Sequence, residues 1–90
     1  MSFVIEMYWP GMSVLLVDDL VARIRQAAAD ADSGISVTGC TMAPTDEVCF
    51  VRVDAPTGAA VRTLVARLGL VGARVSETID LPGLGGGEDA

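Results

Sequence analysis

Two stretches of the chain repeat apolar residues at the three- and four-residue spacing that places them on one face of an α-helix. Residues 17–31 form the first stripe, with charged and polar residues on the other face. We predict a helix here that is capped by Ser13 and stops at Ser33-Gly34. The second stripe consists of Val61, Leu64, Val65 and Leu68. It predicts a helix with Thr57 as its N-cap and a Schellman stop at Gly69-Leu70.

The other patterned segments favour β-strands. Residues 3–9 are almost continuously apolar and aromatic, which predicts a strand that is covered on both sides. Residues 35–42 and 47–54 are short β-rich runs on either side of the proline-containing turn 43–46, a pattern typical of a hairpin. Residues 74–81 alternate with a period of two, so a last strand is predicted there.

The predicted order, β-α-β-β-α-β, is that of a ferredoxin-like α+β domain. Such a domain has a four-stranded antiparallel sheet, with the first and third strands at its centre and both helices on one side. We place the domain at residues 1–81, and we predict that the glycine-rich acidic segment 82–90 is a flexible tail. Alternation along the strands places Phe3, Ile5, Met7, Cys49, Val51 and Val53 beneath the helices and Val4, Glu6, Tyr8, Phe50 and Arg52 on the uncovered side.

The uncovered side of this sheet is too apolar to remain in water, since Val4, Tyr8 and Phe50 are all expected on it. Packing against the sheet of a second copy is the simplest cover. We therefore predict a homodimer with the architecture of a dimeric α+β barrel.

Composition excludes several classes of function. The chain has 90 residues, enough for one domain, and 51% of them are hydrophobic, which argues against disorder. Twelve acidic residues against six basic ones give a net charge of -6, so binding to nucleic acid or to an anionic membrane is not expected. There is no signal-peptide pattern, no apolar run of membrane-spanning length and no cysteine scaffold. A cytoplasmic protein is therefore predicted.

Part of the chain resembles a known family. The residues that carry the resemblance are Ala55-Pro56, Val61-Arg62, Arg67, Gly69-Leu70 and Arg74-Val75-Ser76-Glu77, together with Phe3-Val4-Ile5-Glu6 and Pro10-Gly11. They are similar to a small ferredoxin-like domain-of-unknown-function family that includes actinobacterial nickel-binding proteins. The resemblance implies a dimeric protein, with nickel or another divalent metal as a candidate ligand. Some members carry a histidine in the second strand, but the matching position here is Gly39 or Thr38 and the chain has no histidine, so no metal ligand is transferred.

Glu6 and Glu77 are charged residues within otherwise apolar strands that should be neighbours. Two carboxylates held together could bind a cation or share a proton. The structural alternative is an ion pair with Arg52 or Arg74 across the sheet or the dimer seam. Tyr8 could donate a hydrogen bond in the same space, and Arg52 could hold an anion. The candidate ligand-binding residues are therefore Glu6, Tyr8, Arg52 and Glu77.

Two further groups have both a structural and a functional interpretation. Tyr8, Trp9 and Phe50 either line a small-molecule pocket between two sheets or pack an ordinary interface.

With the turn placed as above, Cys40 lies opposite Cys49 across the hairpin. These thiols either fill buried space, or form a bridge or hold a soft metal.

These observations favour a small homodimeric binding protein that holds a metal ion or a small hydrophobic ligand between its sheets. Two other hypotheses stay open: a cofactor-free enzyme of the dimeric α+β barrel type, such as an isomerase or a monooxygenase, and a pure assembly module. Nucleophilic catalysis has no support, because there is no histidine to activate a serine or a cysteine. No catalytic residue is predicted.

Overall fold

The computed structural model describes residues 1–79 and 81 of the chain. Its elements, in chain order, are β1 (Ser2–Tyr8), α1 (Val14–Asp30), β2 (Ser36–Ala43), β3 (Val48–Asp54), α2 (Gly58–Arg67) and β4 (Arg74–Thr78). The predicted order of strands and helices is confirmed. The last strand ends at Thr78 rather than at Leu81, and the predicted tail, residues 82–90, lies outside the described residues.

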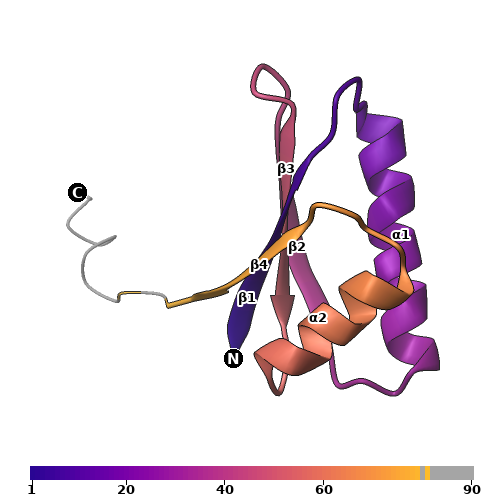
Figure 1. Ribbon diagram of the computed structural model, residues 1–90, viewed down its shortest axis with the longest axis vertical. Helices are drawn as coiled ribbons and strands as arrows, with labels where there is room; N and C mark the ends of the chain where they lie inside the picture. The colour runs from indigo at the N-terminus through magenta and orange to yellow at the C-terminus, as the bar shows by residue number, and fades with distance from the viewer. Residues whose placement is uncertain (80, 82–90) are drawn as a thin grey trace.

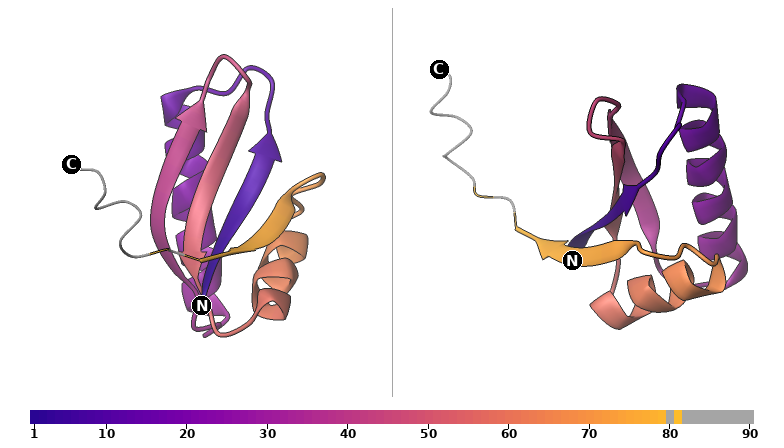
Figure 2. Two further views of the ribbon diagram at one scale, coloured as in Figure 1. Left: turned by 90° about the vertical axis from the view of Figure 1, so that its left-hand side faces the viewer. Right: turned by 45° about the horizontal axis from the view of Figure 1, so that its top comes forward.

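The four strands form one antiparallel sheet in the order β2-β3-β1-β4. Both helices lie on the same side of this sheet (Figure 1). A view from the opposite side shows the strands in front and the helices behind them (Figure 2, left). This is the predicted ferredoxin-like α+β fold, and it leaves one face of the sheet without a helix over it.

The hydrophobic core lies between the sheet and the two helices. The central strands contribute alternate residues that are at most 7% exposed: Phe3, Ile5 and Met7 from β1, and Cys49, Val51 and Val53 from β3. The helices contribute Val17, Leu20, Val21, Ile24 and Ala28 from α1, and Val61, Leu64 and Val65 from α2. The alternation and the helical stripes therefore predicted the inward side of these four elements correctly.

Both helices begin at the predicted caps. The side-chain oxygen of Ser13 accepts a hydrogen bond from the amide of Leu16 at 3.2 Å, and that of Thr57 accepts one from the amide of Ala60 at 3.1 Å. Each cap satisfies an amide group that has no partner within its helix.

The helix ends agree with the prediction for α2 and differ for α1. In α2 the predicted Schellman motif forms, with Gly69 in the left-handed conformation at φ 69°. The end of α1 precedes the predicted stop at Ser33-Gly34, because Asp32 already has a left-handed backbone at φ 49°. The amide of Ser33 then donates to the carbonyl of Ala28 at 3.3 Å, which closes the helix. Aspartate is one of the few residues other than glycine that adopt this conformation readily.

The hairpin between β2 and β3 has a different register from the predicted one. The amide of Asp46 donates to the carbonyl of Ala43 at 3.1 Å, so the expected turn forms. Glu47 follows in a left-handed conformation, at φ 56°, before pairing resumes. The first strand pair is therefore Ala43 with Val48. Because the loop occupies residues 44–47 instead of 43–46, the cross-strand partners differ from those predicted.

Candidate functional site

The side of the sheet that has no helix over it carries the candidate site. We call it the open face and define it by the residues that alternate with the buried ones. It consists of Ser2, Val4, Glu6 and Tyr8 on β1, Val48, Phe50, Arg52 and Asp54 on β3, Ser36, Gly39, Thr41 and Ala43 on β2, and Arg74, Ser76 and Thr78 on β4. The left view of Figure 2 looks onto this face.

Apolar and polar side chains alternate across the two central strands of the open face. Val4 lies opposite Arg52, Glu6 opposite Phe50, and Tyr8 opposite Val48. The two valines and Phe50 are partly buried, whereas Tyr8 is 68% exposed. Of the four candidate ligand-binding residues, the structure thus brings Glu6, Tyr8 and Arg52 to one surface.

Arg52 lies across the neighbouring strand β2. Its Nη1 donates a hydrogen bond to Oγ1 of Thr41 at 2.8 Å. Its guanidinium passes over Gly39, where a Cβ would overlap Nη2 and lie 3.0 Å from Cζ. Sequence reasoning did not connect Gly39 or Thr41 with Arg52. A glycine inside a predicted strand was the available signal, since it often marks the close approach of another group.

Glu6 places a carboxylate in the middle of the open face. It is partly buried, and Arg74 lies opposite it on β4. Within residues 1–79 and 81, the only ion pair joins the amino group of Met1 to Asp54, at 3.1 Å. Glu6 therefore has a basic residue opposite it on β4 but forms no salt bridge within the described part of the chain.

Glu77 does not share this face, so the predicted pair of carboxylates at Glu6 and Glu77 is wrong. In the pairing of β1 with β4, Glu77 lies opposite Phe3, and Glu6 lies opposite Arg74. Cross-strand partners point to the same side of a sheet. Because Phe3 is buried beneath the helices, Glu77 belongs to the helix side, where it is exposed at the edge strand. The sequence indicated which strands are neighbours but not which residues pair.

The hydroxyl of Tyr8 is already engaged within the chain. It donates to Oε1 of Glu47 at 3.3 Å, and Oε2 of the same carboxylate accepts a hydrogen bond from the amide of Gly11 at 3.2 Å. The amide of Trp9 also donates to the carbonyl of Glu47, at 2.7 Å. Glu47, which no sequence pattern marked, thus ties the β2–β3 loop to the end of β1. Donation from Tyr8 to a ligand would require exchange of its bond to Glu47.

The two cysteines lie on the helix side of the sheet and are not directly opposite each other. Cys40 pairs with Val51, and Cys49 pairs with Met42. The prediction that the two cysteines lie opposite each other is therefore wrong, because the hairpin loop occupies residues 44–47 instead of 43–46. Burial raises the pKa of both thiols, and Cys49 is fully buried. Protonated, enclosed thiols are typical of cysteines that fill space. Among the described residues, no group of three His, Cys, Asp or Glu side chains is placed to hold a metal ion.

A hollow of about 340 Å³ lies beside the end of β1. It is lined by Met7, Tyr8, Trp9, Leu20, Arg23, Gly69, Leu70 and Val71. Tyr8 and Trp9 therefore share a hollow with α1 and the loop before β4. Phe50 is not among its lining residues, so the three aromatic residues do not line one hollow within the chain.

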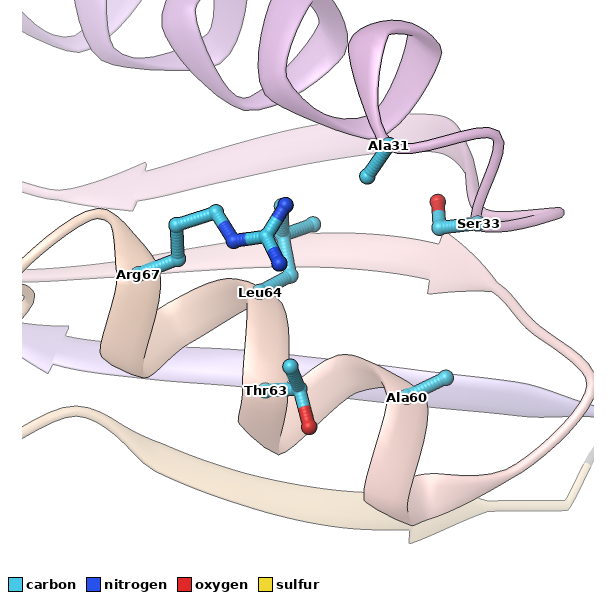
Figure 3. Close-up of a pocket in the computed structure, with 6 residues that line it drawn as sticks. All are labelled: Ala31, Ser33, Ala60, Thr63, Leu64 and Arg67. Carbon is cyan, nitrogen blue, oxygen red and sulfur yellow. The ribbon is translucent and has the colours of Figure 1, made fainter.

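A second hollow, of about 220 Å³, lies between the end of α1 and the length of α2 (Figure 3). It is lined by Ala31, Ser33, Ala60, Thr63, Leu64 and Arg67. The hydroxyl of Ser33 donates to the carbonyl of Ala28 at 3.1 Å and accepts from the amide of Ile35 at 3.2 Å. Both hydrogen bonds of this hydroxyl are therefore made within the fold.

Comparisons with protein-family models, with curated proteins and with solved structures gave no match to this chain. The family resemblance described above therefore stays a prediction, and the function is inferred from the geometry of the open face. Among the described residues, none of the helices is both long and apolar enough to cross a membrane.

Proposed function

We propose that the protein is a homodimer whose two open faces pack together and hold a small ligand between them. The observation that carries the proposal is the composition of the open face, where partly buried Val4, Val48 and Phe50 adjoin the charged Glu6 and Arg52. A sheet face that stays in water is normally polar, with its apolar residues directed to the core. A second sheet would remove these apolar side chains from water.

The charges of the open face suit a second copy of the same face. In a twofold dimer the same surface meets itself, so a residue contacts partners from its own face in the other copy. Glu6 on β1 lies opposite Arg74 on β4 and opposite Phe50 on β3, one strand pair away from Arg52. The Glu6 carboxylate of one copy can therefore pair with an arginine of the other, which favours this arrangement over contact with an unrelated surface.

A small organic ligand fits the open face better than a metal ion does. Glu6 and Asp54 are the carboxylates on this face, and Asp54 already forms an ion pair with the amino group of Met1. Glu77 belongs to the helix side, and both cysteines lie beneath the helices. Transition metals are bound by several nitrogen, oxygen or sulfur ligands, and a dimer would offer one Glu6 from each copy. An organic molecule can instead use the apolar side chains as walls and the charged groups as polar contacts.

Light scattering and native mass spectrometry of the purified chain test this proposal. We expect the wild-type chain to be a dimer at micromolar concentration. Phe50→Asp should be monomeric, because it adds a charge to the centre of the seam. Its circular dichroism spectrum should remain that of the wild type, which shows that the variant is folded. The matched control is Val71→Asp, since Val71 is 99% exposed and lies outside the open face; this variant should remain dimeric. A monomeric wild-type chain, or a Phe50→Asp variant that dimerises as the wild type does, would contradict the proposal.

A further inference from the structure

We infer that the open face binds the carboxylate group of its ligand at the guanidinium of Arg52, which lies over Gly39 and is hydrogen-bonded to Thr41 on strand β2. This inference rests on the proposed function, because it names the class of molecule that the two sheets would enclose. That class is a monocarboxylate with an apolar body.

The guanidinium of Arg52 is held in place before any ligand binds. Thr41 fixes one end of it through the 2.8 Å hydrogen bond from Nη1. Gly39 provides the space for the other end, because a Cβ at that position would overlap Nη2. A free surface arginine loses rotamer freedom when it binds an anion, which weakens binding. Arg52 has already lost much of that freedom, so the same contact should be stronger here.

Most donors of this guanidinium are still available. Arginine carries several N–H donors in a fixed planar arrangement, and the side-chain hydrogen bond found for Arg52 in the described part of the chain is the one to Thr41. No carboxylate of residues 1–79 and 81 forms a salt bridge with it. A carboxylate accepts two parallel N–H bonds from a guanidinium, so its shape matches the unoccupied side.

The surroundings of Arg52 favour a singly charged, partly apolar ligand. Val4 lies opposite Arg52 on β1, and Phe50 precedes it on the same face of β3. The body of a ligand held at Arg52 would therefore lie on apolar side chains. Glu6 lies opposite Phe50, Asp54 follows Arg52 on the same face of β3, and the chain has a net charge of -6. These negative charges disfavour a dianion such as phosphate at a site with one guanidinium.

Calorimetric titration of the dimer with benzoate tests the inference, with benzamide as the uncharged molecule of the same shape. We expect benzoate to bind at least about tenfold more tightly than benzamide, since charge-assisted hydrogen bonds are the stronger kind. Inorganic phosphate at equal concentration should not displace it. Arg52→Gln should weaken benzoate binding by about tenfold or more. Arg25→Gln, which removes the same charge from an exposed position on α1, should leave benzoate binding unchanged.

Gly39→Ala tests the position of the guanidinium without changing any charge. The added methyl group would meet the flexible end of the Arg52 side chain rather than backbone, so the fold and the dimer should be retained. We expect benzoate affinity to fall several-fold. Wild-type benzoate affinity in both Gly39→Ala and Arg52→Gln would overturn the inference, as would equal binding of benzamide or displacement by phosphate.

The oligomeric state separates a failure of this inference from a failure of the proposed function. A dimeric wild-type chain that binds no benzoate would overturn the carboxylate site and leave the dimer in place. A monomeric wild-type chain would contradict the proposed function itself. If Arg52→Gln turns a dimer into a monomer, Arg52 serves the seam between the copies, and the carboxylate site is likewise overturned.

Discussion

The two faces of one sheet differ in what their residues have to satisfy. On β1, the residues beneath the helices are Phe3, Ile5 and Met7, and those between them are Val4, Glu6 and Tyr8. The first set is apolar and almost fully buried, so packing alone accounts for it. The second set mixes aliphatic, acidic and aromatic side chains and has no helix over it. Function in this small fold is therefore expected where alternate residues depart from what packing requires.

Valine-to-alanine substitutions on the two faces should give the largest difference in the free energy of unfolding. Val51→Ala removes both γ-methyl groups from a fully buried site on β3 and should lower the free energy of unfolding by about 2–3 kcal/mol, from lost burial and the cavity left behind. Val4→Ala removes the same atoms from the partly buried open face and should lower it by less than about 1 kcal/mol. Urea denaturation at low protein concentration, where dimerisation contributes least, measures both. Equal losses would show that the open face is packed like the core.

Alkaline pH should destabilise the folded protein, because the buried thiol of Cys49 ionises less readily in the folded state than in the unfolded state. Burial raises the pKa of this thiol, so the folded state favours its protonated form more than the unfolded state does. The resulting stabilisation is complete below the pKa of the unfolded thiol and is lost as the pH rises through the folded pKa. The free energy of unfolding should therefore fall as the pH enters the range in which thiols ionise. Cys49→Ala should reduce that slope, and an unchanged slope would assign the titration to another group.

The smallest expected effect separates the two glutamates. Glu6→Gln and Glu77→Gln remove the same charge from opposite sides of the sheet, and each should change the free energy of unfolding by less than about 0.5 kcal/mol. Only Glu6→Gln should weaken the dimer, by a few-fold, because only Glu6 lies on the proposed seam. Sedimentation equilibrium measures the dissociation constant. If Glu77→Gln weakens the dimer equally, total charge rather than position controls assembly.

The parts of the fold that depend on short-range sequence were predictable. The caps Ser13 and Thr57 and the helix stripes involve residues within one or two turns of each other. The inward side of each central strand follows from alternation along that strand. Once the order β-α-β-β-α-β is known, few arrangements of the sheet satisfy the rules of chain connection, so the strand order followed as well.

The predictions that failed needed information about pairing between distant residues. Glu77 was placed beside Glu6 because their strands are neighbours, but a change of one residue in register reverses the face of every side chain. Glu47, in a left-handed conformation that its sequence did not indicate, moved the hairpin loop and separated Cys40 from Cys49. Thr41 was missed for a related reason, since its importance comes from a contact with another strand.

Gly39 also makes Arg52 traceable in related sequences. A residue with a side chain at position 39 would occupy the space of the guanidinium. An arginine at position 52 could then not keep its guanidinium over strand β2. Glycine at position 39 and arginine at position 52 are therefore expected to co-vary, retained as a pair or lost as a pair during divergence. Relatives that keep the fold but exchange both residues would have changed the chemistry of the molecule they recognise.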